Sequence, residues 1–374
     1  NTLIGLIMFN LNFGRKAETP VQYTFENFFD RVKYEFRRSK NKKFSYLINR
    51  LKWNYFPRLG ITPEFPLNID IEASSACELK CDHCFRQYMD MRENQFMKFD
   101  LYKKIIDEAS KYKLFTLKFS MRGEPTSDKD LPRKVEYAKK MGIKEVWINT
   151  HGANLNEEFT RKLLKAKPDW ITVSIDGLNE MYESIRKPMK FKTIFENAKR
   201  LKILRDEISP DTFLNTQGLW SAIKHDPKDY YNTLKPHFDR VAYNMDMNFK
   251  EIDVIPDPEF VCPRLWLRLA ITSEGDVLKC PSDFEKDEVM GNIREKSIKE
   301  IWDIEQEKNR QLHLAKKKNE SIPCKKCHHG AKIVPKKNDL GIMQSEATNY
   351  QFRKEFDGVG LNRQKQITHD KQNS

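Results

Sequence analysis

Cysteines are the residues of this chain whose type and spacing most clearly predict metal chemistry. Three of them lie together as Cys77, Cys81 and Cys84, and no other follows until Cys262. Thiolates are the preferred ligands of iron–sulfur clusters, and three on one loop leave one iron without a protein ligand. An open coordination position distinguishes a reactive metal centre from a structural one. The loop therefore predicts a reactive cluster, with a zinc knuckle completed by His83 as the alternative.

A second group contains the remaining cysteines. A hairpin pattern over 265–280 brings two of them together, and a CxxC turn supplies the other two. Four thiolates complete a tetrahedral site, which indicates a structural or electron-transfer role, and zinc is again the alternative. The residues of this group are Cys262, Cys280, Cys324 and Cys327. Because three plus four uses all seven cysteines, the chain predicts two metal sites in a reducing compartment rather than a disulfide framework.

The elements that must position these groups follow a repeated pattern of strand and helix. The expected strands are 67–73, 116–121, 145–150, 170–175, 212–217 and 240–244. The expected helices are 99–113, 130–142, 156–167, 191–207 and 227–237. This alternation predicts βα units around a parallel sheet, with the chemistry at the carboxyl ends of the strands. Periodicity alone leaves open whether the sheet is a partial barrel or an open, doubly wound sheet.

The loop from Cys77 to Cys84, placed after the first strand, resembles that of the radical S-adenosylmethionine (SAM) enzymes. The resemblance covers about residues 65–250. It implies an α/β fold with a (β/α)6 partial barrel, similar to a TIM barrel, and a 4Fe-4S cluster whose open iron binds SAM. It also implies that reductive cleavage of SAM produces a 5′-deoxyadenosyl radical, which abstracts a hydrogen atom from the substrate.

The resemblance also implies which residues contact SAM. The segment 121–125 resembles the family's GGE motif, whose backbone and carboxylate bind the methionyl amine, although Arg122 replaces its first glycine. Other positions match contacts to the ribose, the carboxylate or the adenine. The implied cofactor-binding residues are His83, Gly123, Glu124, Ser174, Asp176 and Arg186.

The region around the last four cysteines resembles the SPASM and shorter twitch extensions of these enzymes, with one auxiliary 4Fe-4S cluster. The four-ligand pattern looks most like a dehydrogenase of an aminocyclitol alcohol. The function it implies is two-electron oxidation of a sugar, cyclitol or nucleotide-sugar alcohol, with the auxiliary cluster accepting an electron. Candidates for the catalytic residue are His151, Tyr243 and Asn215. A peptide or protein maturase, of the RiPP or sulfatase-maturase type, is the alternative enzyme, and a zinc-binding structural protein is the alternative of another class.

Charge and composition set the remaining expectations. The net charge is +13, and no apolar stretch approaches the length of a spanning helix, which excludes a polytopic membrane protein. We expect a cytoplasmic enzyme with a small-molecule substrate, an electron donor such as flavodoxin or ferredoxin, and no nucleic-acid partner. The basic N-terminal segment predicts an anionic substrate or peripheral membrane contact. The expected domains are a basic helical extension (1–64), the barrel (65–250), the SPASM/twitch domain (251–335) and a partly disordered polar tail (336–374).

Overall fold

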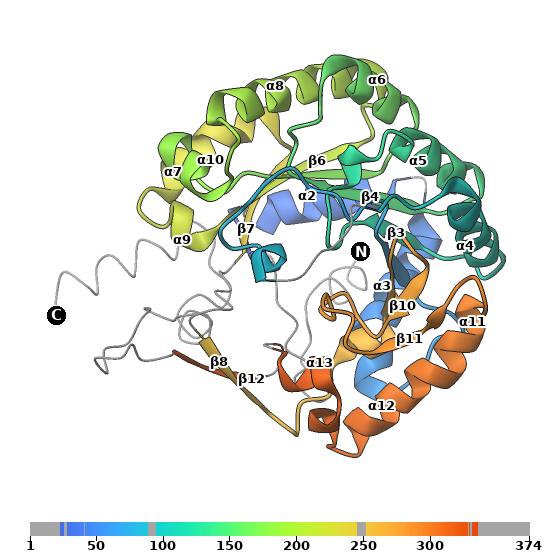
Figure 1. Cartoon of the computed structure of the whole chain (residues 1–374). Coiled ribbons are helices and arrows are strands. Elements are labelled where there is room, and N and C mark those ends of the chain that lie inside the picture. The colour runs from blue at the N-terminus through green and yellow to red at the C-terminus, as the bar shows by residue number, and fades with distance from the viewer. Residues whose placement is uncertain are drawn as a thin grey trace.

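The computed structural model describes residues 23–25, 28–40, 42–88, 95–244, 252–327, 329 and 331–335. The predicted tail, 336–374, and the first 22 residues lie outside this part of the chain. Within it, one ten-stranded sheet organises the molecule (Figure 1).

Six parallel strands form the centre of this sheet in the order in which they occur along the chain. They are β2 (Asn68–Ile71), β3 (Thr116–Phe119), β4 (Glu145–Thr150), β5 (Trp170–Ser174), β6 (Phe213–Leu219) and β7 (Arg240–Asn244). A doubly wound sheet would reverse its strand order at a switch point. Because the order never reverses here, successive right-handed crossovers place the helices on one face. The predicted partial barrel is confirmed, and the doubly wound alternative is excluded.

The outer face of the sheet is covered by the helices that connect the strands (Figure 1). They are α4 (Phe99–Lys111), α5 (Leu131–Lys140), α6 (Glu157–Lys165), α7 (Asn179–Ile185), α8 (Phe191–Ile208), α9 (Trp220–Ile223) and α10 (Pro227–Leu234). On α4, for example, Leu101, Ile105 and Ala109 recur at helical spacing and are buried. The short helices α7 and α9 were not predicted, because each has too few residues for a periodic pattern to show.

The C-terminal part extends the same sheet. β9 (Arg268–Ile271) pairs in parallel with β2, and β10 (Asp276–Leu278) returns antiparallel to β9, which confirms the predicted hairpin. The sequence did not predict that this hairpin would continue the barrel sheet. The remaining elements are β8 (Ile252–Pro256), β11 (Val289–Asn292), α11 (Ile298–Glu300), a π-helical turn (Ile301–Glu305), α12 (Gln306–Leu314), α13 (Ile322–Lys325) and β12 (Ala331–Pro335).

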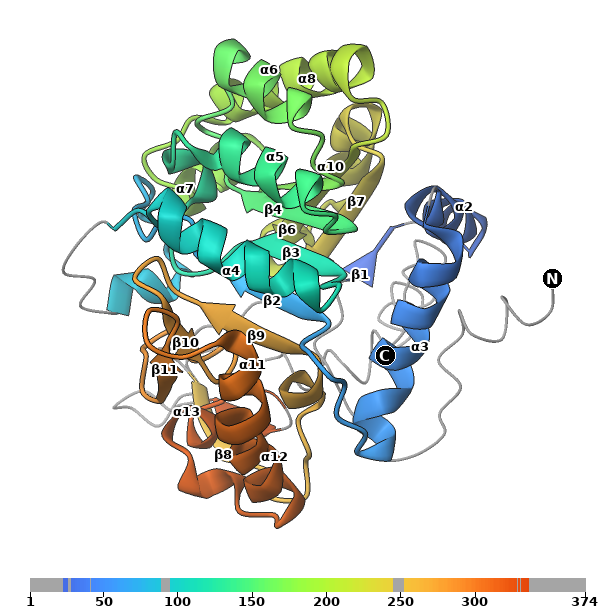
Figure 2. The ribbon, with the colours of Figure 1, turned by 90° about the vertical axis from the view of Figure 1, so that its right-hand side faces the viewer.

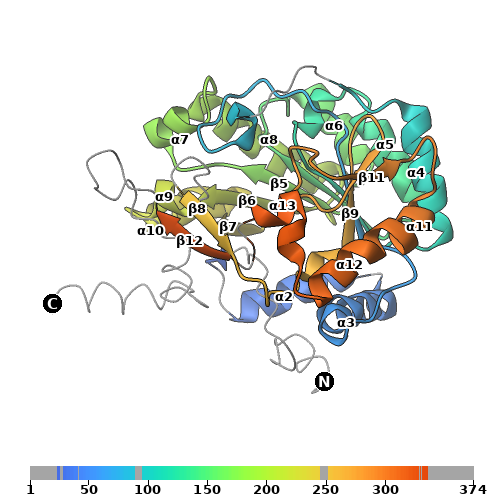
Figure 3. The ribbon, with the colours of Figure 1, turned by 60° about the horizontal axis from the view of Figure 1, so that its bottom comes forward.

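The predicted helical character of the basic N-terminal segment is present in two helices, α2 (Phe28–Ser39) and α3 (Lys43–Leu59). They lie apart from the outer helices (Figure 2, Figure 3). The ring of Tyr34 on α2 packs edge-on against Trp170 and Phe213, with centroids 5.2 and 5.0 Å apart. Both of these rings belong to the first residues of their strands, so α2 covers the amino-terminal end of the barrel.

Three cations of this segment pair with carboxylates at the same end of the barrel. Arg37 contacts Asp239 at 2.7 Å and Lys42 contacts Asp169 at 2.6 Å. Arg38 makes two hydrogen bonds to Glu145, at 2.9 and 2.7 Å. These pairs surround a cavity of about 550 Å³ at the end of the barrel opposite the cysteine loop. Part of the basic character of the segment therefore serves to attach it to the barrel.

Candidate cluster-binding sites

The first cysteine loop starts where β2 ends, at the carboxyl end of the barrel strands. Burial and, to a smaller extent, repulsion from the neighbouring thiols of Cys84 and Cys77 raise the pKa of the Cys81 thiol to about 12. The loop backbone is fixed because Asp82 N donates to Ile185 O at 3.2 Å. The structure therefore gathers the three predicted ligands in a site where thiolates need a compensating cation.

Gly123 allows the end of β3 to touch the start of this loop. A Cβ atom at position 123 would lie 2.2 Å from Ser74 O, so any other residue would force the two segments apart. The next amide, Glu124 N, donates to Ala76 O at 2.7 Å. The predicted importance of this glycine thus has a steric cause, which is a backbone contact next to Cys77.

Arg122, the departure from the family motif, turns its side chain away from the cysteines. Its Nε and Nη2 donate to the two carboxylate oxygens of Glu72 at 2.6 and 2.8 Å. Ser273 Oγ, in the β9–β10 turn, donates to the same carboxylate at 2.9 Å. Burial opposes the charge on Glu72, but these bonds outweigh it and lower its pKa. The arginine therefore joins the end of β3 to the C-terminal hairpin.

The carboxylate of Glu124 is buried and hydrogen-bonded through both oxygens. Its Oε1 accepts from Thr126 N at 2.9 Å, from Thr126 Oγ1 at 2.6 Å and from Thr150 Oγ1 at 2.6 Å. Its Oε2 accepts from His151 N at 2.8 Å. Glu124 therefore fixes the loops after β3 and β4, and Oε2, with one donor, keeps capacity for a second hydrogen bond.

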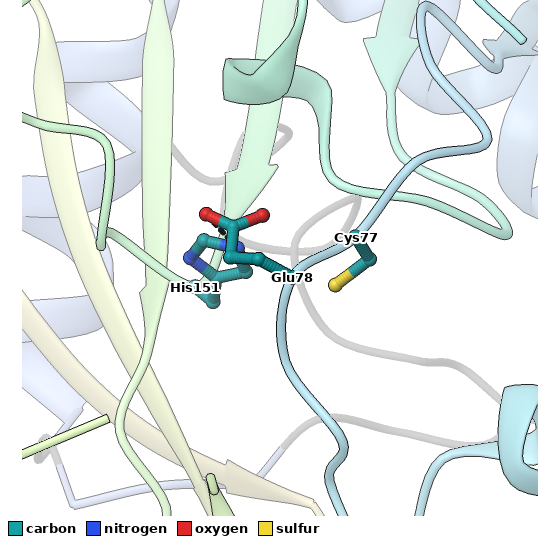
Figure 4. A group of neighbouring side chains, drawn as sticks. All are labelled: Cys77, Glu78 and His151. Carbon is teal, nitrogen blue, oxygen red and sulfur yellow. Dashed lines mark ion pairs between the residues drawn. The ribbon is translucent and has the colours of Figure 1, made fainter. Parts of the chain in front are cut away.

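His151, a candidate catalytic residue, lies beside the first cysteine of the loop. Its Nε2 is 3.3 Å from Glu78 Oε1 and 3.4 Å from Glu124 Oε2, and a ligand atom of Cys77 lies within 4.8 Å (Figure 4). Nε2 makes no hydrogen bond among the described residues. Its N–H therefore lies near the acceptor atoms of Glu78, Glu124 and Cys77 without bonding to any of them. Burial disfavours the charged ring, and the Glu124 and Glu78 carboxylates raise the pKa of His151 to about 10, but Ala153 N donates to Nδ1 at 3.0 Å and so favours the neutral ring. No motif in the sequence indicated that Glu78 belongs to this group.

The other residues predicted to contact SAM lie at the end of β5, at the end of α7 and in the cysteine loop. Asp176 and Arg186 form a buried pair, with Nε donating to Oδ2 at 2.7 Å, and the charge of Arg186 lowers the pKa of Cys81 against the effect of burial. Ser174 Oγ accepts from Gln217 Nε2 at 3.2 Å. His83 is partly buried between Cys81 and Cys84 in the loop. The structure thus brings Arg186 to the cysteine loop as a counter-charge.

The structure separates the other two catalytic candidates. Asn215 is buried on β6, where its Nδ2 donates to Thr172 Oγ1 at 3.2 Å, and its Oδ1 has no partner among the described residues. Tyr243 belongs to the hydrophobic core and packs against the rings of Phe25 and Trp220. Tyr243 is therefore placed as a packing residue, whereas Asn215 retains an acceptor.

The second group of cysteines converges from three separate segments. Burial raises the pKa of Cys280 and of Cys327 to about 12, and repulsion from Cys262 and Cys324 contributes to both. Free thiols are present at all four positions. Cys280 and Cys327 thus lie within electrostatic range of Cys262 and Cys324, although the first and last of the four are 65 positions apart in the chain.

Helix α12 holds this second group with a buried polar face. Gln306, Asn309, Arg310 and His313 recur at helical spacing and are all buried. Gln306 Nε2 donates to Lys279 O at 3.1 Å, and Arg310 Nε donates to Leu265 O at 3.0 Å. These carbonyls belong to residues close to Cys280 and Cys262. This face was not predicted, although its polar residues recur with the period of a helix in the sequence.

The donor sets fit the groups that the sequence predicted. Three thiols on one loop suit a cluster with an open iron, and four thiols suit a closed one. Residues 71–218 match the Radical SAM superfamily, and residues 262–328 match SPASM, an iron–sulfur cluster-binding domain. The chain belongs to the radical SAM superfamily and carries a SPASM domain. Its cofactors are SAM, a SAM-binding 4Fe-4S cluster and an auxiliary cluster, which displaces the zinc alternative.

Curated relatives match parts of the chain. It is 34% identical over 110 residues to Fe-coproporphyrin III synthase of Methanosarcina barkeri, covering 29% of this chain and 27% of the relative. It is 33% identical over 129 residues to a probable GTP 3′,8-cyclase of Methanococcus maripaludis, covering 34% and 39%. It is 26% identical to an S-adenosylmethionine-dependent nucleotide dehydratase of Flammeovirga pacifica, covering 43% and 56%. The chain thus spans between about a quarter and just over half of these relatives.

Solved structures share the fold. BtrN, in complex with AdoMet and 2-DOIA, superposes with a TM-score of 0.50 at 20% identity, covering 72% of this chain and 94% of BtrN. SuiB of Streptococcus suis, bound to the precursor peptide SuiA, superposes with a TM-score of 0.51 at 15% identity, covering 83% and 78%. At these identities the similarity establishes the architecture alone.

Proposed function

We propose that this radical SAM enzyme is an oxidoreductase that removes two electrons from an alcohol carbon of a sugar, cyclitol or nucleotide sugar. The observation that carries the proposal is the use of all seven cysteines in one open and one closed site. A chain that assigns every thiol to a cluster keeps none to return a hydrogen atom to its substrate, so oxidation with electron export is the simplest outcome.

The proposed reaction conserves atoms and electrons. When bound, the two clusters and SAM supply a 5′-deoxyadenosyl radical and an acceptor for one electron. The alcohol carbon gives up a hydrogen atom, which produces 5′-deoxyadenosine, and the hydroxyl gives up a proton. The last electron leaves the substrate, and the C–O bond becomes a carbonyl. One electron from the donor is consumed in the cleavage of SAM, and one electron returns through the auxiliary cluster. The net change is therefore SAM and alcohol to methionine, 5′-deoxyadenosine, ketone and a proton, with SAM as the oxidant.

The residues of this chain are proposed to divide the work in three ways. Cys77, Cys81 and Cys84 bind the SAM cluster, and the four later cysteines bind the auxiliary one. The backbone at Gly123 and His83 and the side chains of Glu124, Ser174, Asp176 and Arg186 contact SAM. The unpartnered Oδ1 of Asn215 accepts a hydrogen bond from a ligand hydroxyl. His151 is poorly placed as the base, because its Nδ1 already accepts from Ala153 N at 3.0 Å.

The names of two relatives favour a nucleotide portion in the substrate. One is a probable GTP cyclase and the other is a nucleotide dehydratase. A peptide maturase is the second candidate, because SuiB was solved with a precursor peptide and shares the fold. Anaerobic incubation with nucleotide sugars, free cyclitols and peptides separates these candidates. The proposal expects one 5′-deoxyadenosine per molecule of ketone, without deuterium uptake from D2O. Deuterium at an inverted carbon would contradict it.

The partners are also part of this proposal. We expect a small, anionic substrate and a one-electron donor such as flavodoxin or ferredoxin. None of the described helices is both long and apolar enough to cross a membrane. Peripheral membrane contact would depend on the exposed rings of Phe36 and Phe44, which are 61% and 75% exposed, because Arg37 and Arg38 are paired with carboxylates. Sedimentation with anionic vesicles of the wild type and of a Phe36→Ser/Phe44→Ser variant tests this contact.

A further inference from the structure

His313 on α12 touches two cysteines of the second group at once. Its Nδ1 accepts a hydrogen bond from the backbone N–H of Cys262 at 3.3 Å. Its Nε2 lies 3.4 Å from the sulfur of Cys324, within the range of an N–H···S hydrogen bond. The ring is 2% exposed, so its two nitrogens have little access to water. The two cysteines are 62 positions apart in the chain, and this one side chain connects them.

The first contact determines where the ring carries its proton. A nitrogen that accepts a backbone N–H holds a lone pair, so the single proton of a neutral imidazole must be on the other nitrogen. Nε2–H is then a donor, and a cysteine sulfur that binds iron is an acceptor.

We propose that His313 is a positioning residue of the auxiliary cluster, which donates Nε2–H to the sulfur of Cys324 and holds Cys324 next to Cys262. Hydrogen bonds to ligand sulfurs are among the factors that set cluster reduction potentials. A donor at Cys324 stabilises the reduced form, because that form places more negative charge on its sulfurs. The inference rests on the proposed function, in which this cluster accepts an electron from the substrate.

The buried ammonium group of Lys318 is also expected to stabilise the reduced form of the auxiliary cluster. The Lys318 side chain is 2% exposed, and its ammonium lies 5.0 Å from the centroid of the Phe260 ring. Phe260 is two positions before Cys262, so this ammonium lies beside the second group of cysteines. A positive charge in a buried site near the sulfurs also favours the more negative, reduced cluster.

The test isolates the auxiliary cluster in a Cys77→Ala/Cys81→Ala/Cys84→Ala background, which lacks the first one, and titrates its EPR signal against potential. His313→Phe removes both hydrogen bonds, and His313→Asn keeps an acceptor for Cys262 N but lacks a donor at the position of Nε2. We expect both to shift the reduction equilibrium about tenfold toward the oxidised form, which is about 59 mV for one electron. His313→Gln, which places an amide N–H near Nε2, should stay close to the parent, as should the control His237→Gln.

Three results would overturn the proposal. They are an unchanged potential in both His313→Phe and His313→Asn, a shift in His313→Gln equal to that in His313→Asn, or a strong 14N hyperfine coupling in the parent, which would make His313 an iron ligand. If the His313→Phe variant fails to assemble the cluster, the comparison of His313→Asn with His313→Gln still tests the proposal. The potentials are measured without substrate, so a chain that shows these shifts and produces no ketone would refute the proposed function and leave this inference intact.

Discussion

The two cysteine groups of this chain each provide thiols for a cluster, but one takes them from a single loop and the other from separate segments. The first takes three thiols from one eight-residue stretch, Cys77 to Cys84, in a loop at the end of a barrel strand. The second takes four thiols from segments spread between Cys262 and Cys327, and a helix with a polar face holds them. A local loop can leave one iron open to a ligand, whereas a site closed by distant segments excludes one. The spacing of the cysteines in the sequence therefore predicts which cluster can bind a further ligand.

A histidine lies in each group, and the two rings resemble each other. Nδ1 of His151 accepts from Ala153 N, and Nδ1 of His313 accepts from Cys262 N. Their surroundings are opposite in charge. Carboxylates of Glu124 and Glu78 raise the pKa of His151 to about 10 against the effect of burial. Burial and two lysines lower that of His313 to about 3. The same ring geometry thus serves an anionic environment at the open site and a cationic one at the closed site.

The largest expected effect separates the two groups by function. Cys81→Ala should lose about four of about eight irons per chain and all formation of 5′-deoxyadenosine, because the open cluster needs all three thiolates. Cys324→Ala should also lose about four irons, yet it should keep forming 5′-deoxyadenosine without a matching amount of product. Anaerobic iron and sulfide analysis with mass spectrometry of the nucleoside measures both. Loss of SAM cleavage in both variants to the same extent would remove the functional contrast.

The next effect concerns the carboxylate that joins the two regions. Glu72→Gln leaves the buried guanidinium of Arg122 without its charge partner, so we expect the free energy of unfolding to fall by about 3–5 kcal/mol. The matched control is Glu274→Gln, whose pair with Lys286 is half exposed and worth at most about 1 kcal/mol. Thermal unfolding under anaerobic conditions compares them, and equal losses would show that Glu72 does not join the regions.

The residues that could be predicted from the sequence share one property, which is that they lie in local patterns. The three-cysteine loop, the segment 121–125 and the six barrel strands can each be recognised from a few consecutive residues. The Arg122–Glu72–Ser273 contact, the pairing of β9 with β2 and the contact of His313 with two cysteines join segments far apart in the chain. A pattern within one segment contains no information about its partner in another. The placement of Tyr243 in the core was missed for the same reason.

A smaller effect tests the packing of the open site alone. Thr150→Val removes one donor from the buried Glu124 carboxylate, so we expect a loss of about 1.5–3 kcal/mol in the free energy of unfolding, and weaker SAM binding. Thr160→Val is the control, because the Thr160 hydroxyl is buried and has no hydrogen-bond partner among the described residues. Denaturant unfolding and equilibrium binding of SAM measure the two. If Thr160→Val costs as much, the hydrogen bond to Glu124 is not the cause.

The smallest effect concerns a ring contact between the regions. Phe85, next to Cys84, stacks on Phe284, four positions after Cys280, with centroids 4.2 Å apart. Phe284→Leu should cost about 0.5–1.5 kcal/mol, as expected for an aromatic pair. Phe44→Leu on the exposed face of α3 should cost less. Thermal unfolding ranks them, and the reverse order would mean that the stack does not hold the loop.

The central claim is that one cluster is open to SAM and the other is closed. EPR spectra of two reduced variants test it most directly, one with only the first three cysteines changed to alanine and one with only the last four changed. The account predicts that SAM alters the spectrum of the cluster held by Cys77, Cys81 and Cys84 and leaves that of the auxiliary cluster unchanged. A SAM-dependent change in the variant that lacks the first cluster, or none in the variant that keeps it, would contradict the account.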